Sequence, residues 1–302
     1  MLSVKPWKPD AVARLFLSVF VCIYAGSVGA AIARGPAGKG HLLFYAVAAA
    51  ALGFLGAALV LAHQPWTLEA FLRRVGGFAA CFYSGLILGL WSQHLGGPSG
   101  KEAPSVAQMI ITLASFQGAA IVLVTLFLRQ HGTTWEEAFG VGWDKGRAVL
   151  MGAGTVIVFL PAAWALQRCS ADLLTRLTGT APEQQLPVQT LRKATGWDER
   201  LLLGVATILV APVAEELLFR GILYPAIKQA GFPRLALWGT SLLFGAMHLN
   251  LVTFLPLFVL ALALAGLYEW TNNLLAPIST HLLFNAVNFS VLYLWDPRLT
   301  PP

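Results

Sequence analysis

Long stretches of apolar residues recur along this 302-residue sequence. A helix that crosses a membrane needs about 20 mostly apolar residues, because each residue rises 1.5 Å along the helix axis. Nine stretches have roughly this length, and the two at 235–250 and 252–268 could instead form one broken hairpin. The other stretches are 13–33, 42–62, 75–93, 106–128, 147–168, 201–228 and 274–295. The sequence therefore predicts an all-α fold, a polytopic membrane helical bundle of about eight or nine transmembrane helices.

The composition excludes most other classes of protein. Hydrophobic residues make up 57% of the chain and charged residues only 11%, whereas an average soluble domain carries about 25% charged residues. So few charges cannot cover the surface of a soluble enzyme of this size, and so apolar a chain is not disordered. The cysteines Cys22, Cys81 and Cys169 lie far apart, so they predict neither a disulfide framework nor a thiolate zinc site.

The formal net charge of +6 fits a membrane protein. Membrane proteins concentrate Lys and Arg in cytoplasmic loops beside anionic lipid. Nucleic-acid binding is not expected, since the sequence has no long basic run with interleaved aromatic residues. The basic residues of the short loops favour a cytoplasmic N-terminus. We therefore expect an integral protein of the plasma (inner) membrane, with membrane lipid as one partner.

The distribution of polar residues predicts three parts of the chain. Residues 1–168 are expected to form N-terminal transmembrane helices, and residues 169–200, the most polar stretch, a loop. Residues 201–302 are expected to form a catalytic core of helices, because the ionisable residues inside apolar stretches gather there.

The first group of such residues is a pair of adjacent glutamates. Glu216 and Arg220 are four residues apart, so on a helix they share a face and can pair. Glu215 points about 100° away from Glu216. One carboxylate can therefore be structural while the other is chemically active. The alternative is a helix end at the lipid headgroups, where these side chains are simply solvated.

Two further groups lie towards the C-terminus. His248 shares a helix face with Phe244, and His281 shares one with Asn285. Taken singly, each group could be a polar packing contact between helices. However, counting from the expected helix starts at 1.5 Å per residue, Glu215, His248 and His281 lie about 24, 20 and 15 Å along their helices. All three groups could therefore meet at a similar depth inside the membrane.

Carboxylates, imidazoles and an amide around one buried water molecule can catalyse hydrolysis. A glutamate can take a proton from water, and histidine and asparagine side chains can donate to a developing oxyanion. No serine has a nucleophile-elbow sequence and no cysteine lies near these groups. Attack by water is therefore favoured over a covalent acyl-enzyme.

The three groups, read together, resemble a known family. EExxxR at Glu215, Glu216 and Arg220, FxxxH ending at His248, and HxxxN from His281 to Asn285 are similar to the signature motifs of the CPBP family. This family comprises the CAAX proteases and bacteriocin-processing enzymes, the abortive-infection-type intramembrane proteases. The resemblance covers about residues 200–290, including the segment 266–277.

The resemblance implies an endopeptidase with its active site recessed among helices. Glu215 would activate water with help from His248. His281 and Asn285 would stabilise the oxyanion. Glu216, paired with Arg220, would position the first motif.

The resemblance leaves the cofactor open. Bacterial members are usually described as metalloproteases, whereas the prenyl-protein endopeptidase relatives are also described as metal-free glutamate proteases. The sequence has no HExxH motif, so a zinc site would need ligands from separate helices, with Glu215, His248 and His281 as candidates. We favour a site with no metal or with a weakly held one.

The sequence thus predicts an intramembrane endopeptidase acting on a membrane-associated peptide or protein, which could carry a lipid at its C-terminus. A non-proteolytic membrane scaffold, or an immunity-type protein that sequesters a partner, is the main alternative. An ion-coupled transporter is a third possibility, but it would need repeat symmetry that the sequence does not show.

Overall fold

All regular secondary structure in the described residues is helical, which confirms the all-α class. The computed structural model describes residues 3–32, 51–57, 59, 106–142, 144–182, 184–194 and 196–295. Six helices in these ranges are long and apolar enough to cross a membrane, and the protein is therefore an integral membrane protein. They span Pro9–Ala30, Gln108–Gln130, Lys145–Thr178, Trp197–Gln229, Leu251–Thr271 and Leu275–Leu294.

Six of the nine expected spans correspond to these helices. The expected span 75–93 lies outside the described residues, and 42–62 lies mostly outside them. The expected span 235–250 is the helix α12 (Pro233–Met247), whose 15 residues are few for a complete crossing. The total of eight or nine transmembrane helices stays a prediction.

The chain divides into two compact units, Ala13–Ala119 and Met1–Val12 with Ala120–Pro302. The first contains most of α1 (Pro9–Ile32), α4 (Val106–Leu113) and the π-helix η1 (Ala114–Gly118). Within it, Gln108 Nε2 donates a hydrogen bond to Ala30 O at 3.0 Å. This bond ties α4 to the C-terminal part of α1.

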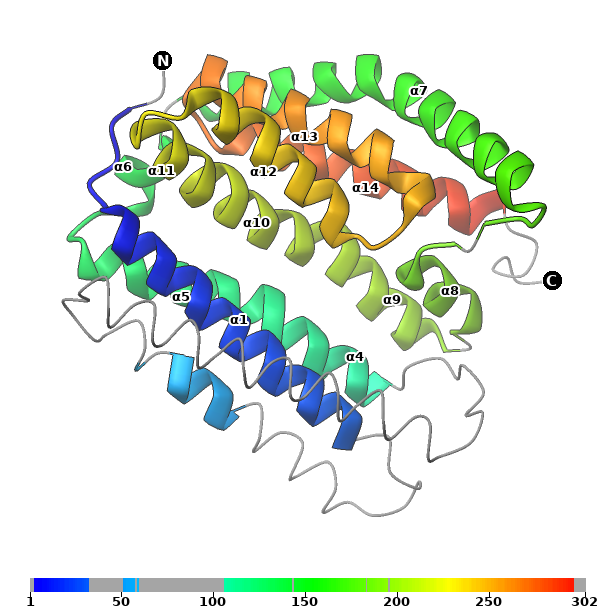
Figure 1. Ribbon diagram of the computed structural model, residues 1–302, viewed down its shortest axis with the longest axis horizontal. Helices are drawn as coiled ribbons and strands as arrows, with labels where there is room; N and C mark the ends of the chain where they lie inside the picture. Colours follow the sequence, from blue (N-terminus) through cyan, green and yellow to red (C-terminus); the bar gives the residue numbers. More distant parts are fainter. Residues whose placement is uncertain are drawn as a thin grey trace. The chain divides into compact units, whose positions relative to one another are not determined.

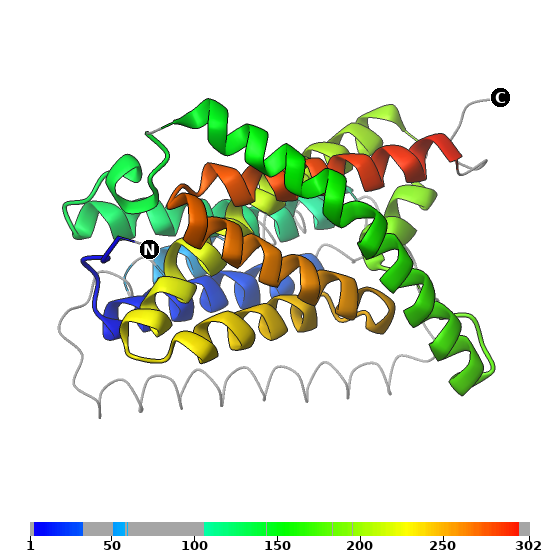
Figure 2. The same cartoon turned by 90° about the horizontal axis from the view of Figure 1, so that it is seen from above.

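The second unit contains all the predicted site residues. Its helices are α5 (Ala119–Gln130), α6 (Trp135–Phe139), α7 (Lys145–Thr178), α8 (Leu186–Lys193), α9 (Trp197–Val205), η2 (Ala206–Val210), α10 (Ala211–Glu216), η3 (Leu217–Leu223), α11 (Tyr224–Gln229), α12, α13 (Leu251–Thr271) and α14 (Leu275–Trp295). The helix α13 packs beside α12, and α7 packs against both α13 and α14 (Figures 1 and 2). The contacts of α7 with α13 and α14 therefore join parts of this unit that are far apart in the sequence.

The elements α9 to α11 form one continuous helix from Trp197 to Gln229, as expected for the apolar stretch 201–228. Two segments of this helix, η2 and η3, are π-helical, with hydrogen bonds from residue i to residue i−5. Such segments place an extra residue in one turn, and they often occur at functional sites. The two glutamates lie between them.

The helix α7 continues ten residues beyond its expected end at residue 168, to Thr178. The residues from 169 to 178 include good helix formers and neither glycine nor proline. Gly179, with a φ of 71°, ends the helix in the left-handed region that glycine adopts at little cost. The polar stretch expected as a loop at 169–200 therefore begins with two to three turns of helix.

The N-terminal segment before α1 is part of the second unit and contacts its helices. Lys5 Nζ donates to Ala138 O at 2.5 Å and lies 5.8 Å from the centre of the Tyr268 ring. Burial lowers the pKa of Lys5 to about 8. Ser3 N donates to Asn272 Oδ1 at 3.0 Å, so the segment contacts both α6 and the turn after α13.

A close approach of α7 to α14 fixes the helix that carries His281. A Cβ atom on Gly152 would lie 2.8 Å from Ala276 O and 3.1 Å from Thr280 N. Thr280, the neighbour of His281, donates to Gly152 O at 3.3 Å. Only glycine at position 152 allows the two backbones to lie this close.

We expect Gly152→Ala to lower the free energy of unfolding by about 1–3 kcal/mol, because the new methyl group forces the two backbones apart. The measurement is thermal unfolding of the purified protein in one detergent. Gly154→Ala is the matched control, since Gly154 lies on the same helix and a Cβ there meets no atom within 4 Å. Equal unfolding temperatures for the two variants would contradict this account of the contact.

Candidate active site

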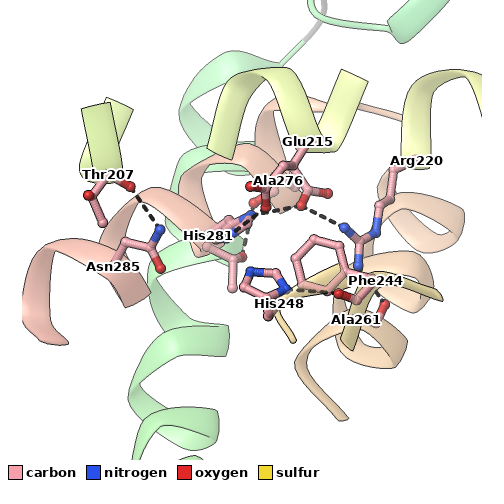
Figure 3. A network of polar contacts seen from close by, with 11 residues as sticks. Thr207, Glu215, Arg220, Phe244, His248, Ala261, Ala276, His281 and Asn285 are labelled. Atoms are coloured by element: carbon pink, nitrogen blue, oxygen red, sulfur yellow. Dashed lines mark hydrogen bonds and ion pairs between the residues drawn. The ribbon is translucent and has the colours of Figure 1, made fainter. Parts of the chain in front are cut away.

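The six predicted site residues come from three segments of the second unit. Glu215 and Glu216 end α10, and Arg220 follows in η3. His248 caps the C-terminal end of α12. His281 and Asn285 lie one turn apart on α14. Figure 3 shows Glu215, His248 and His281 directed towards the same region from these helices.

Glu216 is completely buried and accepts two hydrogen bonds from other side chains. Its Oε1 atom accepts hydrogen bonds from Arg220 Nη1 at 2.8 Å and from His281 Nδ1 at 2.9 Å. Its Oε2 atom is buried without a hydrogen-bond partner in the described part of the chain. Glu216 thus joins the first and third motifs through a single carboxylate oxygen.

Arg220 compensates the buried charge of Glu216. It is 2% exposed, and its Nη2 atom donates to Ala261 O on α13 at 3.1 Å. Its Cζ atom lies 4.6 Å from the centre of the Phe244 ring, within cation–π range. A charge buried among membrane helices is tolerated only with such partners. The pair is therefore a fixed structural element of the site.

Glu215 has a different environment from its neighbour. Its side chain is 14% exposed, and its Oε2 atom lies 3.9 Å from His281 Nε2. His281 Nδ1 bonds to a carboxylate and therefore carries a hydrogen. The Nε2 atom is then the nitrogen left to face Glu215. The carboxylate of Glu215 is thus the more accessible of the two, at an imidazole that Glu216 already holds in place.

His248 reaches this group through Phe244. The Phe244 ring centre lies 5.1 Å from that of His248 and 5.7 Å from that of His281. His248 Nδ1 lies 2.9 Å from Phe244 O. Because a carbonyl oxygen only accepts, the hydrogen is assigned to Nδ1, and in the neutral ring Nε2 is an acceptor. His248 can therefore accept a hydrogen bond from a water molecule at Nε2.

Asn285 is hydrogen-bonded to the backbone of η2 and not to a carboxylate. Its Nδ2 atom donates to Thr207 O in η2 at 2.9 Å (Figure 3). The structure thus brings Glu215, Glu216, Arg220 and His281 into one contact network. It connects His248 to that network through an aromatic ring, and Asn285 through the shared helix α14.

Sequence reasoning did not anticipate three parts of this arrangement. Phe244 contacts both imidazoles and the guanidinium, whereas the sequence indicated only that it shares a face with His248. The acceptors Ala261 O and Thr207 O are backbone atoms. Because every residue has a backbone carbonyl, no sequence signal distinguishes these two.

The zinc ligands suggested by the sequence do not form a complete set. Glu215 Oε2 and His281 Nε2 face each other and could share an ion. However, no three His, Cys, Asp or Glu side chains of the described residues are grouped so that they could hold a metal. A structural zinc site needs four ligands and a catalytic one usually three. The arrangement of these residues therefore does not fit a zinc ion as it stands.

Comparison with known proteins concerns the same part of the chain. Residues 197–287 match the family model described as "Type II CAAX prenyl endopeptidase Rce1-like". We call this matched stretch the Rce1-like segment. It contains all six predicted site residues, and it runs from the start of α9 into α14.

The Rce1-like segment nearly coincides with residues 200–290, over which the motifs indicated a resemblance to the CPBP family. Among curated proteins, the "Uncharacterized protein YpbD" of Bacillus subtilis (strain 168) is 39% identical over 85 residues. That alignment covers 27% of this chain and 40% of the relative. No solved structure matches this chain.

Proposed function

We propose that this protein is an intramembrane endopeptidase that hydrolyses a peptide bond with a water molecule activated by Glu215. The observation that carries the proposal is the division between the adjacent glutamates. Glu216 is fully buried and bound by Arg220 and His281, so it is not available as a base. Glu215 is partly exposed and faces His281 Nε2.

In the proposed reaction, the Glu215 carboxylate takes a proton from a water molecule that His248 Nε2 helps to hold. The resulting hydroxide attacks the carbonyl carbon of the substrate. With hydrogen on both ring nitrogens, His281 keeps its Nδ1 bond to Glu216 and donates from Nε2 to the oxyanion of the tetrahedral intermediate. Asn285 is the second donor to this oxyanion. When the C–N bond breaks, the protonated Glu215 returns its proton to the leaving amine.

The proposed substrate is a membrane-associated peptide or protein, with a lipid at its C-terminus as the favoured form. The site lies on helices long enough to cross a membrane, so a substrate must reach it from the lipid or the membrane surface. The Rce1-like segment supports a CAAX-type cleavage near a prenylated cysteine. Location in the plasma membrane with a cytoplasmic N-terminus belongs to the same proposal.

We further propose that catalysis needs no metal or only a weakly held one. The test is to assay cleavage after dialysis against a chelator and to measure the metal content of the purified protein. We expect full activity at a metal content well below one ion per chain. Loss of cleavage that added zinc restores would refute this part of the proposal and leave the endopeptidase in place.

The proposed activity is tested with purified protein in proteoliposomes. The probe is a peptide with a farnesylated cysteine followed by three C-terminal residues, as in a CAAX sequence, and mass spectrometry identifies the products. In water enriched in ¹⁸O, the new carboxyl group should contain the label, because water supplies the attacking oxygen.

We expect His248→Ala to lower kcat/KM in this assay about 100-fold, because the attacking water loses a group that helps to hold it.

The control for this assay is Asp198→Asn, which changes an exposed side chain outside the network, at the start of α9. This variant should cleave the peptide like the wild type. Absence of cleavage by the wild type on farnesylated and unmodified peptides alike would contradict the endopeptidase. The non-proteolytic scaffold would then be favoured.

A further inference from the structure

The π-helical segment η2 ends at Val210, a little more than one turn before Glu215. The N–H of Ala211 donates to Ala206 O, five residues earlier. In an α-helix that N–H would instead donate to Thr207 O, four residues earlier. The π-helical register therefore removes from Thr207 O the donor that it would have in an α-helix.

The next possible donor to Thr207 O is also absent. In the π-helical register, the N–H of residue 212 would donate to this oxygen. Residue 212 is a proline, which has no N–H. Neither Ala211 nor Pro212 can then serve Thr207 O, and a carbonyl left without a donor among membrane helices is costly.

The side chain of Asn285 supplies the missing donor. Its Nδ2 atom donates to Thr207 O at 2.9 Å (Figure 3). Because the partner is a carbonyl oxygen, the bond requires the NH₂ group, and not the amide oxygen, to face η2. One N–H of the NH₂ group is used in this bond, and the other is left at a fixed angle to it.

We propose that Pro212 is a positioning residue that acts through Asn285. By withholding an N–H, Pro212 leaves Thr207 O free to accept from Asn285, and this bond orients the amide so that its second N–H can donate to the oxyanion. The inference rests on the proposed endopeptidase function. It gives a chemical role to a proline that would otherwise only bend the helix.

The test compares backbone donors at position 212 in the farnesylated-peptide assay. Pro212→Ala introduces an N–H that competes for Thr207 O, so we expect kcat to fall about tenfold with KM unchanged. Replacing Pro212 with lactate, the α-hydroxy analogue of alanine, forms an ester with no N–H and should retain the wild-type kcat. Pro161→Ala is the control, since Pro161 is an exposed proline inside α7 and should not affect kcat.

A double-variant cycle separates positioning from a general effect on the helix. If Pro212 acts through Asn285, Pro212→Ala combined with Asn285→Ala has the same kcat as Asn285→Ala alone. Two effects that multiply, or a wild-type kcat in Pro212→Ala, would overturn this inference alone. Absence of cleavage by the wild-type protein would overturn the inference together with the proposed function.

Discussion

Glu215→Gln is expected to lower kcat/KM for the farnesylated peptide by about 1,000-fold or more. A positioned general base contributes about 100- to 10,000-fold, and glutamine cannot accept the proton of the attacking water. The substitution keeps the size of the side chain. Glu215 makes no short hydrogen bond in the described structure, only the 3.9 Å approach to His281, so the fold should be preserved.

The matched control is Glu136→Gln, the same chemical change at an exposed carboxylate in α6. It should cleave like the wild type, and both variants should unfold at the wild-type temperature. Normal cleavage by Glu215→Gln would mean that another group activates the water. A large fall in its unfolding temperature would mean that Glu215 supports the fold instead.

The second large effect concerns stability. Arg220→Met is expected to lower the free energy of unfolding by about 3–5 kcal/mol, because it leaves the Glu216 carboxylate buried without its counter-charge. Methionine retains much of the volume of the arginine stem. Thermal or denaturant unfolding in a single detergent measures the change. An unfolding temperature within experimental error of the wild type would show that the buried pair is not needed for stability.

The double variant Glu216→Gln with Arg220→Met distinguishes stability from chemistry. Removing both charges should recover most of the lost stability, because no unpaired charge remains buried. Cleavage should stay impaired, since a neutral amide oxygen replaces the carboxylate that accepts the hydrogen bond from His281 Nδ1, and a neutral acceptor forms a weaker bond. Recovery of full activity with stability would mean that the Glu216–His281 contact has no part in positioning His281.

The contacts that are local in sequence could be predicted. Glu216 and Arg220 are four residues apart on one helix, and this spacing alone places their side chains together. The different directions of Glu215 and Glu216 follow from the 100° step of a helix. The bond between Glu216 and His281 joins residues 65 positions apart. It depends on how α10 and α14 pack, which periodicity does not specify.

Helix boundaries were predicted less well than helix positions. The composition of residues 169–178 is polar enough for a loop, yet these residues extend α7 because no glycine or proline interrupts them before Gly179. The π-helical segments could not be foreseen, since a one-residue change of register leaves the apolar pattern nearly unchanged. That change of register nevertheless determines which carbonyl Asn285 contacts.

The length of α12 determines how deep in the bilayer its last residues lie. Its 15 residues rise about 22 Å, whereas the hydrocarbon core of a bilayer is about 30 Å thick. Arg234 lies in the first turn and favours a start at the headgroups. The non-helical backbone at His248–Asn250 then lies below the opposite surface, where polar groups need water. We therefore expect water to reach this backbone, and His248 with it, from that surface.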